Sequence, residues 1–432
     1  MSQKKISRRT LLKSSAAAAF AFSIVPSHVL GRGNHGITAP SNQLTRGIIG
    51  CGGMARGHMK YPGRIAAICD VDTKQLNGGL EECKKNGHKV DTYTDFREML
   101  QRPDLDIISV VTPPHWHALH AIAAAEAGKD VWCEKPMSRT IGEGQKMVAA
   151  CKKNGTIFRI NTWYRYMSNF YGTGITVKNL KKIVDSGILG WPLKVVISGH
   201  TGFNWKIDQW SGKYNLPKTR VPQHFDYDFW LGPAPEKEYH PHRTHRSFRG
   251  YWDYDGGGLG DMGMHYIDPV QYYLGKDNTS PVSVEVDTDD QDPDAVKGWR
   301  KIYYKYADGC EIILDGNNSM EGAAYIEGPN GKIFKGMKST IKNLMQIAKS
   351  LPDPAPIESD FYNAVKTRNK FALNELNGHR STTVVNMGIT AIRLNRSLQY
   401  DPIKQVFIND DEANRLINQP MRAPWTLSGG IQ

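Results

Sequence analysis

Short apolar runs alternate with amphipathic stretches over residues 44–166. Two of the amphipathic stretches, His117–Ala127 and Gly142–Lys153, are predicted helices that end at Gly128 and at Asn154-Gly155, which are typical stop signals. Strands that alternate with helices predict βαβ units and therefore a doubly wound parallel sheet. The predicted strands are Gly47–Ile49, Arg64–Cys69, Lys89–Tyr93, Ile107–Val110, Asp130–Cys133 and Ile157–Asn161.

The pattern changes after residue 166. A helix is predicted near Ile175–Ser186 and a strand at Leu193–Ser198, before a long aromatic and histidine-containing stretch, Trp205–Asp255. Residues 167–432 are expected to form an α+β domain with an open, largely antiparallel sheet. The segments that support this expectation are alternating ones at Val282–Val286, Lys301–Tyr306 and Glu311–Leu314, and helical ones near Ser359–Leu376 and Thr382–Leu398.

The N-terminus carries Ser7-Arg8-Arg9-Thr10-Leu11-Leu12-Lys13 and then a mildly apolar stretch through Val25. This segment resembles a twin-arginine export signal, which addresses proteins that are exported already folded. Ala16–Val25 is too short to span a bilayer, which needs about 20 apolar residues. We therefore expect a signal at residues 1–31, a linker at 32–43 and a periplasmic location. A basic disordered tail is the alternative, and an uncleaved signal would tether the protein to the membrane.

The net charge of +12 is concentrated at this end, because residues 1–32 contain six basic side chains and no acidic one. The other charges are mixed in sign without an arginine-rich run, which argues against a nucleic-acid partner. The cysteines form neither a CxxC pattern nor a secreted disulfide framework, so buried free thiols are expected. Five of the six lie in the first predicted domain: Cys51, Cys69, Cys83, Cys133 and Cys151.

A glycine-rich turn, Gly50-Cys51-Gly52-Gly53-Met54-Ala55, follows the first predicted strand and opens a helix, as the G-x-G-x-x-G/A dinucleotide fingerprint requires. Gly50 allows the tight turn, and Gly52 lets backbone amides approach a pyrophosphate. Asp70 ends the second strand, where its carboxylate can accept hydrogen bonds from ribose hydroxyls and repel a 2′-phosphate. These residues predict NAD as the cofactor. Arg56 or Lys74 could instead pair with the extra phosphate of NADP.

Three further motifs complete the pattern. Val111–His117 and Cys133–Pro136, the latter containing Glu134-Lys135-Pro136, lie at the carboxyl ends of the fourth and fifth strands, where open α/β sheets bind ligands. Gly256–Asp268 is rich in glycine and carries Asp261, His265 and Asp268 on one face of a predicted helix. With the fingerprint, these motifs resemble the glucose-fructose oxidoreductase, inositol dehydrogenase and rhizopine-catabolism (Gfo/Idh/MocA) family. The resemblance covers essentially everything after the signal.

The resemblance implies a Rossmann domain at residues 44–166 and a substrate-binding and oligomerisation domain at 167–432. It also implies a catalytic set of Lys135, Asp261 and His265. His265 would be the general base or acid, because a hydroxyl proton must leave as hydride departs from the same carbon. Asp261 would orient His265 or the substrate hydroxyl, and Lys135 would stabilise the developing alkoxide.

The remaining site residues follow from the same resemblance. Arg165, Tyr164 and Asp268 are expected to bind substrate, although a structural salt bridge explains Arg165 equally well. The cofactor-binding residues are expected to be Gly50, Gly52, Gly53, Met54, Ala55, Asp70, Thr112, Pro113, His117, Glu134 and Lys135.

Two histidine clusters and one acidic run are candidate metal sites. The clusters, His240/His242/His245 and His115/His117/His120, lack a recognised zinc spacing with a carboxylate partner. Asp290–Asp294 begins like a calcium loop, but Ala295 and Lys301 stand where an EF-hand needs glycine and glutamate. We expect no catalytic metal. The aromatic side chains of Trp205–Trp252 are expected to form sugar-stacking walls, although core packing would use many of the same residues.

NAD is scarce outside the cytoplasm, so an exported enzyme of this kind is expected to hold its cofactor tightly and to run a closed redox cycle. The expected reaction is oxidation of a ring hydroxyl of a sugar or glycoside, in one form giving a 3-keto sugar. The alternatives are an NAD-dependent glycosidase or lyase that oxidises the sugar transiently, and a sugar sensor or scaffold without turnover. The presence of the catalytic set argues against the last. The expected partners are the twin-arginine export machinery and, by analogy with relatives, further copies of the chain in a homo-oligomer.

Overall fold

The computed structural model describes residues 43–162, 165, 170 and 173–427. The predicted export signal, nearly all of the predicted linker, and Tyr164 lie outside these residues. Thr45–Gln432 forms a structural unit of its own, and the description below concerns that unit.

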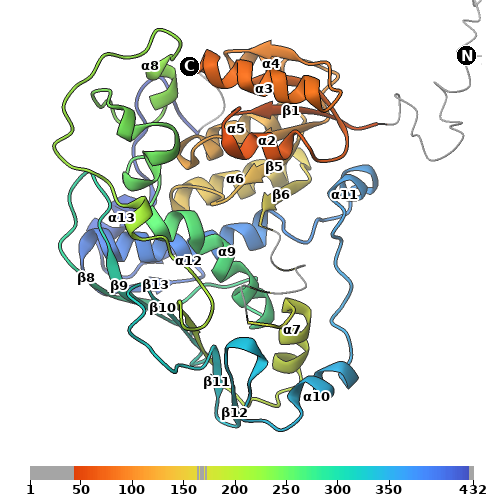
Figure 1. The fold of residues 1–432 in the computed structure, drawn as a ribbon, viewed down its shortest axis with the longest axis vertical. Coiled ribbons are helices and arrows are strands. Elements are labelled where there is room, and N and C mark those ends of the chain that lie inside the picture. The colour runs from red at the N-terminus through yellow and green to blue at the C-terminus, as the bar shows by residue number, and fades with distance from the viewer. Residues whose placement is uncertain (1–42, 163–164, 166–169, 171–172, 428–432) are drawn as a thin grey trace, which may run out of the picture. The chain divides into compact units, whose positions relative to one another are not determined.

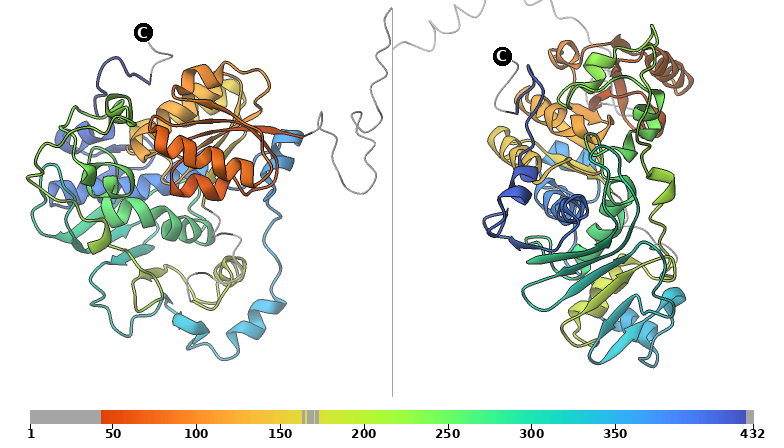
Figure 2. Two further views of the ribbon diagram at one scale, coloured as in Figure 1. Left: turned by 45° about the horizontal axis from the view of Figure 1, so that its top comes forward. Right: turned by 90° about the vertical axis from the view of Figure 1, so that its left-hand side faces the viewer.

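Six parallel strands with helices on both faces make up the first part of this unit (Figures 1 and 2). The strand order is β3-β2-β1-β4-β5-β6, as expected for a doubly wound sheet. β1 and β5 are buried along their whole length, because both faces of the sheet are covered. The elements are β1 (Thr45–Ile49), α2 (Gly53–His58), β2 (Arg64–Cys69), α3 (Thr73–Lys85), β3 (Asp91–Tyr93), α4 (Phe96–Leu100), β4 (Ile107–Val110), α5 (Pro114–Glu126), β5 (Asp130–Glu134), α6 (Ile141–Asn154) and β6 (Phe158–Asn161).

The second part is built on an eight-stranded sheet of order β12-β11-β7-β10-β9-β8-β13-β14. Only the β7–β10 pair is parallel, so the sheet is mixed and mostly antiparallel, as the sequence predicts. Its elements begin with α7 (Val177–Asp185), β7 (Lys194–Ile197), α8 (Tyr227–Leu231), α9 (Gly257–Tyr273), β8 (Ser283–Thr288), β9 (Trp299–Lys305) and β10 (Glu311–Asp315). They continue with β11 (Ile326–Gly328), β12 (Gly331–Ile333), α10 (Leu344–Ser350), α11 (Phe361–Thr367), α12 (Glu375–Leu394), β13 (Leu398–Asp401), β14 (Val406–Phe407) and α13 (Asp411–Ile417).

Helices α9 and α12 connect the two sheets. They pack against each other, and α12 also contacts α6 of the first part and β8 of the second (Figure 1). The apolar core of the second part includes Leu259 and Tyr266 of α9, Val384 of α12 and Ile302 of β9. α9 is therefore held on both sides, and its N-terminal turns are fixed relative to the first sheet.

The late helices differ from the sequence prediction. The segment predicted as one helix near Ser359–Leu376 contains α11, which ends at Thr367, and the start of α12, whose N-cap is Asn374. Arg368 after α11 is left-handed and its guanidinium binds Asp130, so the helix ends where this distant ion pair forms. The helix predicted to reach Leu398 ends at Leu394, because the chain turns at Asn395 into β13.

All six cysteines are buried and free, which confirms the expectation of unpaired thiols. In the part of the chain that the structure describes, no helix has the length and apolar character needed to span a bilayer.

Candidate active site

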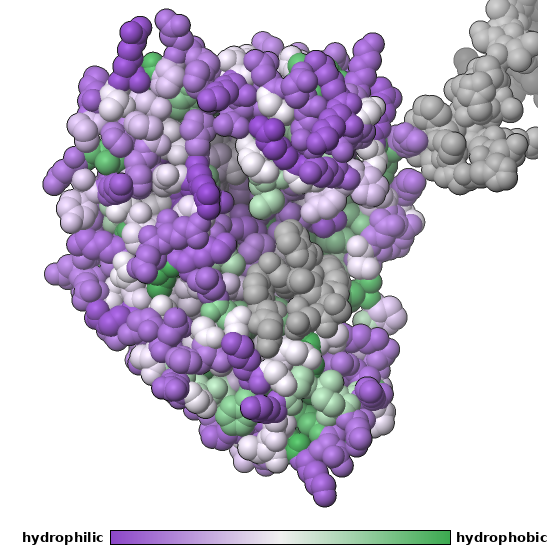
Figure 3. Space-filling view, viewed as in Figure 1, coloured by the Kyte–Doolittle hydropathy of each residue, from purple (hydrophilic) through white to green (hydrophobic). Residues whose placement is uncertain are grey.

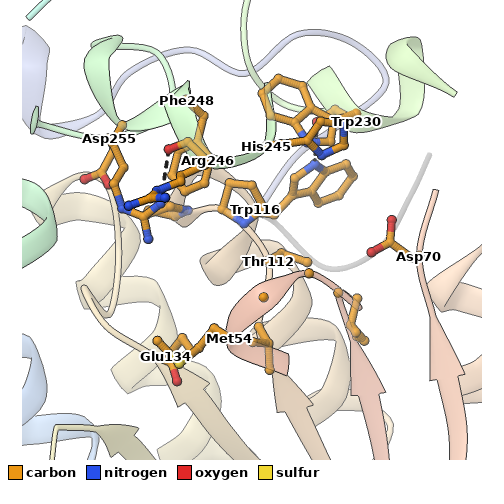
Figure 4. A pocket seen from close by; sticks show the side chains of 18 of the residues that line it. Met54, Asp70, Thr112, Trp116, Glu134, Trp230, His245, Arg246, Phe248 and Asp255 are labelled. Carbon is orange, nitrogen blue, oxygen red and sulfur yellow. Dashed lines mark hydrogen bonds between the residues drawn. The ribbon is translucent and has the colours of Figure 1, made fainter. Parts of the chain in front are cut away.

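A cavity of about 640 Å³ lies over the carboxyl ends of the parallel strands (Figure 4). Its floor comes from the loops after β1, β2, β4 and β5, and its far wall from residues 206–255, here named the cover segment. The cover segment contains α8 and short 3₁₀ turns at Asp208–Trp210, Pro241–Arg243 and His245–Gly250. On the molecular surface the region between the cover segment and the first sheet is a hollow in a largely hydrophilic face (Figure 3).

The glycine-rich turn forms one side of this floor. Gly50 has a φ of +91°, and a Cβ at this position would lie 2.7 Å from the carbonyl oxygen of Val111. At Gly52 and Gly53 a Cβ would meet nothing within 4 Å, so their backbone borders open space. This space and the start of α2 suit the pyrophosphate of a dinucleotide.

We expect Gly50→Ala to destabilise the protein by about 1–3 kcal/mol, since a side chain here is strained as well as too close to Val111. Urea unfolding measures the loss. Gly53→Ala is the matched control, because its Cβ enters open space and should change the unfolding free energy by no more than about 0.5 kcal/mol. Equal losses in both variants would contradict this interpretation of the turn.

Asp70 lines the opposite side of the floor from the catalytic residues. Its carboxylate accepts hydrogen bonds from the backbone N–H groups of Cys51 (2.7 Å) and Asp72 (2.8 Å). Burial raises the pKa of Asp70 to about 6, and the two N–H groups oppose that rise. At neutral pH the carboxylate is therefore charged and able to accept further hydrogen bonds, as a ribose diol requires. The turn and Asp70 together fit a dinucleotide.

Most of the other predicted cofactor residues also line the cavity: Met54, Thr112, Pro113, Glu134 and Lys135. Ala55 and His117 do not, and both lie beneath it. Ala55 is fully buried in the apolar core of the first sheet, which is the close packing expected of it. His117 lies within hydrogen-bond distance of the carbonyls of Thr112 (2.8 Å) and Pro136 (2.7 Å), so it holds together the loops after β4 and β5.

Lys135 and Asp261 are in direct contact at the other end of the cavity. Lys135 Nζ donates to the Asp261 carboxylate (2.8 Å) and to its backbone carbonyl (2.6 Å). Burial alone would raise the pKa of Asp261, but the charges of Lys135 and Arg249 hold it well below its ordinary range. Asp261 is therefore an anion at every physiological pH.

His265 lies one turn further along α9 and also lines the cavity. Its Nδ1 is 3.3 Å from the hydroxyl of Thr162. Burial, followed by the charge of Lys135, lowers the pKa of His265 to about 3. The imidazole is consequently neutral at pH 7, the form that can accept a proton. The structure thus brings the three predicted catalytic residues to one end of one cavity.

Arg165 and Asp268, which were predicted to bind substrate, do not line this cavity and instead pair with each other. Asp268 is fully buried and accepts two hydrogen bonds of 2.7 Å from the Arg165 guanidinium. Arg165 also binds Asp277, and Ser381 donates to Asp268. Neither Arg165 nor Asp268 lines the cavity, because Asp268 follows Asp261 by seven residues and so lies about 10 Å further along the helix axis. The contacts of Arg165 are those of the structural salt bridge given above as its alternative role.

Several residues of the cavity were not singled out from the sequence. Arg249 Nε donates to Asp261 (2.9 Å), and the indole N–H of Trp210 donates to its other oxygen (2.8 Å). Burial raises the pKa of Asp255 to about 7, and this carboxyl faces the same end of the cavity (Figure 4). The signal in the sequence is the density of arginine and aromatic residues in the cover segment, whose aromatic side chains alone were expected to form sugar-stacking walls.

The histidine clusters have structural contacts. His115 contacts the carbonyl of Trp230 (3.0 Å), and His120 stacks on Trp116 at 4.6 Å between ring centroids. In the described ranges of the chain, no group of three or more histidine, cysteine or acidic side chains is arranged to hold a metal ion.

A dinucleotide turn and a lysine–aspartate–histidine set that share one cavity define the class of nicotinamide-dependent oxidoreductases. The chain belongs to the Gfo/Idh/MocA oxidoreductase family. Residues 44–162 match the family's NAD-binding Rossmann fold, and residues 173–427 match its C-terminal alpha/beta domain. The predicted family, the predicted fold and NAD as the cofactor are thereby confirmed.

Individual relatives are more distant. Inositol 2-dehydrogenase from Salmonella typhimurium is 28% identical over 159 residues, which are 35% of this chain and 44% of that protein. A glycosyl hydrolase family 109 protein from Shewanella baltica is 31% identical over 171 residues, 34% of this chain and 37% of that protein. These alignments span less than half of either relative. The crystal structure of the WlbA dehydrogenase from Bordetella pertussis shares the fold, with a TM-score of 0.56, 17% identity and coverage of 83% of this chain and 99% of that one.

Proposed function

We propose that this protein is an exported oxidoreductase that oxidises a ring hydroxyl of a sugar or glycoside and keeps its NAD bound between turnovers. The observation that carries the proposal is the contact of Lys135 with Asp261, beside His265, in the cavity that the dinucleotide turn borders. NAD, when bound against the Gly50 turn and Asp70, would supply the acceptor for the hydride of the carbon that carries the hydroxyl. Sugar-type names among the relatives, such as inositol 2-dehydrogenase, support a carbohydrate substrate.

In this proposal, side chains of the protein accept the hydroxyl proton and stabilise the charge left behind. Neutral His265 accepts it, and its pKa, which burial holds at about 3 in the protein without ligands, is expected to rise when a negatively charged alkoxide develops beside it. Lys135 stabilises that developing charge with an N–H donor, and Asp261 holds Lys135 in place. The residues therefore supply a proton acceptor and a cation at the reacting hydroxyl.

Retention of NAD is supported by the contacts of the cover segment with the first sheet. The carbonyl of Trp230 accepts hydrogen bonds from the Trp116 indole (2.8 Å) and lies 3.0 Å from His115. On the adenosine side, the backbone N–H of Thr73 donates to the carbonyl of His224 (2.9 Å), and the buried Asp72 carboxylate contacts His224 at 3.0 Å. These contacts hold the cover segment beside the expected nucleotide site and would slow the departure of a bound nucleotide.

The C-terminal segment strengthens this closure. Arg422 binds the carboxylate and carbonyl of Asp228 in α8, and Trp425 packs edge-on against Trp116 at 4.7 Å between centroids. We expect Trp425→Ala to speed loss of NAD by about three- to tenfold, the effect of one lost aromatic contact. Nucleotide retained through repeated buffer exchange measures the rate. Trp191→Ala, which removes an exposed tryptophan outside the cavity lining, should retain NAD like the unaltered protein.

Export and self-association complete the proposal. Export rests on the Arg8-Arg9 motif. Fractionation of cells that produce the Arg8→Lys/Arg9→Lys protein tests it, and retention of that protein in the cytoplasm is the expected result.

A homo-oligomer would use the second sheet, on which Glu285, Tyr303 and Lys305 are exposed. Light scattering of the purified protein tests this, and a monomer at every concentration would end the idea.

The central experiment combines release of the nucleotide with product analysis. Denaturation of the purified protein should release NAD or NADH in near-equal amount to the protein, and addition of a substrate should raise absorbance at 340 nm before denaturation. Mass spectrometry of products from a glycoside panel then identifies the reaction. If no nucleotide is released, the proposal that NAD stays bound is wrong. If the absorbance stays flat with every sugar, the proposal of sugar oxidation is wrong.

The second candidate is an NAD-dependent glycosidase, which the similarity to a glycosyl hydrolase family 109 protein favours. In that case the same panel would release free aglycone without any added oxidant, and the product would be the unoxidised sugar.

A further inference from the structure

Basic side chains gather at the reacting end of the cavity in excess of acidic ones. Lys135, Lys206, Arg246 and Arg249 line this end, against the three carboxyls of Glu134, Asp255 and Asp261. Asp261 is shared by three of the four cations: Lys135 at 2.8 Å, Arg249 at 2.9 Å and Lys206 at 3.8 Å. Burial raises the pKa of Asp255 to about 7, so near neutral pH it supplies less than one full negative charge.

Arg246 is the cation of this cluster that pairs with none of these carboxylates. Arg246 is solvent-exposed and lines the cavity, its guanidinium lies over Trp210 at 5.3 Å from the ring centroid, and it makes no ion pair with any described residue. Arg249 lies over the same ring at 4.8 Å. Two guanidinium groups held on one indole repel each other, and a bound anion would offset that repulsion.

The pyrophosphate of NAD is not the anion that this cluster fits. Figure 4 shows Asp70 on one side of the cavity and Arg246, Phe248 and Asp255 on the other, with Met54 and Thr112 between them. Asp70 marks the adenosine end, and the amides of the Gly50 turn serve the pyrophosphate. The basic cluster instead lies at the end where Lys135 and Asp261 meet.

We propose that the substrate is an acidic sugar and that Arg246 binds its anionic group. This inference rests on the proposed function, and it names the chemical class of the substrate: a sugar that bears a carboxylate, sulfate or phosphate. Arginine binds such groups through two parallel N–H donors, and Trp210 holds the guanidinium plane in the cavity. Arg246 is thus a specificity residue, separate from the proton-handling set.

The test compares neutral and acidic sugars on the protein with its NAD bound. The probes are methyl glucoside, methyl glucuronide, glucose 6-sulfate and glucose 6-phosphate, and reduction of the bound nucleotide is followed at 340 nm. At least one acidic probe should react with a KM about 10–100-fold below that of methyl glucoside, the effect of one charge-assisted hydrogen-bonded pair. The three acidic arms distinguish the anion.

Arg246→Gln should raise the KM for the preferred acidic probe by the same factor while kcat and the KM for methyl glucoside stay within about twofold. Arg220→Gln is the matched control, because Arg220 is exposed in the same cover segment but does not line the cavity. Equal KM values for neutral and acidic probes, or an Arg246→Gln protein with unchanged selectivity, would overturn the acidic-sugar proposal and leave the oxidoreductase proposal standing.

A calorimetric titration separates the two proposals when no probe reacts. Tighter binding of the glucuronide than of the glucoside, lost in Arg246→Gln, would support the acidic ligand even as the proposed reaction failed. Absence of any binding preference in that titration would overturn the acidic-sugar proposal too.

Discussion

Lys135→Met is expected to lower the rate of nicotinamide reduction by about 10²–10⁴-fold, because it removes the cation beside the reacting hydroxyl while keeping the length of the side chain. Lys135 Nζ makes two hydrogen bonds to Asp261, and methionine can make neither. Single-turnover absorbance at 340 nm measures the loss, and the amount of nucleotide released on denaturation shows that NAD is still bound.

Lys129→Met is the matched control for this prediction. Lys129 is also buried and donates to the carbonyl of Arg102 (2.8 Å), but it does not line the cavity. Its replacement should leave the reduction rate unchanged, whatever it does to stability. A Lys135→Met protein that works within threefold of the unaltered one would remove Lys135 from the catalytic set.

Arg165→Met should have the largest effect on stability, about 3–5 kcal/mol, because it leaves the fully buried Asp268 without its counter-ion. Urea unfolding measures the loss. Arg165→Met combined with Asp268→Leu should be less destabilised than Arg165→Met alone, since no buried charge then stays unpaired.

Arg300→Met is the surface control. Arg300 pairs with Asp287 and Asp289, and all three side chains are exposed to solvent, so the ion pairs contribute little to stability. Its urea midpoint should match that of the unaltered protein. If Arg165→Met unfolded at that same midpoint, the structural role of the buried pair would be contradicted.

Features with local determinants were predictable from the sequence. The Gly50 turn needs only a strand, a glycine at the position of φ +91° and the start of a helix, all within a few residues. Likewise, β4 is buried along its whole length, and its sequence Ile-Ile-Ser-Val is a nearly continuous apolar run.

Features that depend on partners distant in the sequence could not be predicted. Arg165 and Asp268 are 103 residues apart, and nothing local distinguishes a buried pair from two ligands of a sugar. Arg368 ends α11 by binding Asp130, so helical propensity alone overestimated that helix. The roles of Arg249 and Trp210 depend on how the cover segment folds back onto α9, and sequence spacing does not encode that path.

If the cover segment retains NAD as proposed, it also makes cofactor loading depend on folding. Its contacts join Trp230 to Trp116 and His224 to Thr73, across the space where the dinucleotide is expected to lie. NAD would therefore enter before these contacts close, or later through local unfolding of the segment. Molecules that fold faster than they meet NAD would stay empty, and a preparation would be a mixture of loaded and unloaded protein with two unfolding transitions. The nucleotide content of a sample would then record the conditions under which it was made.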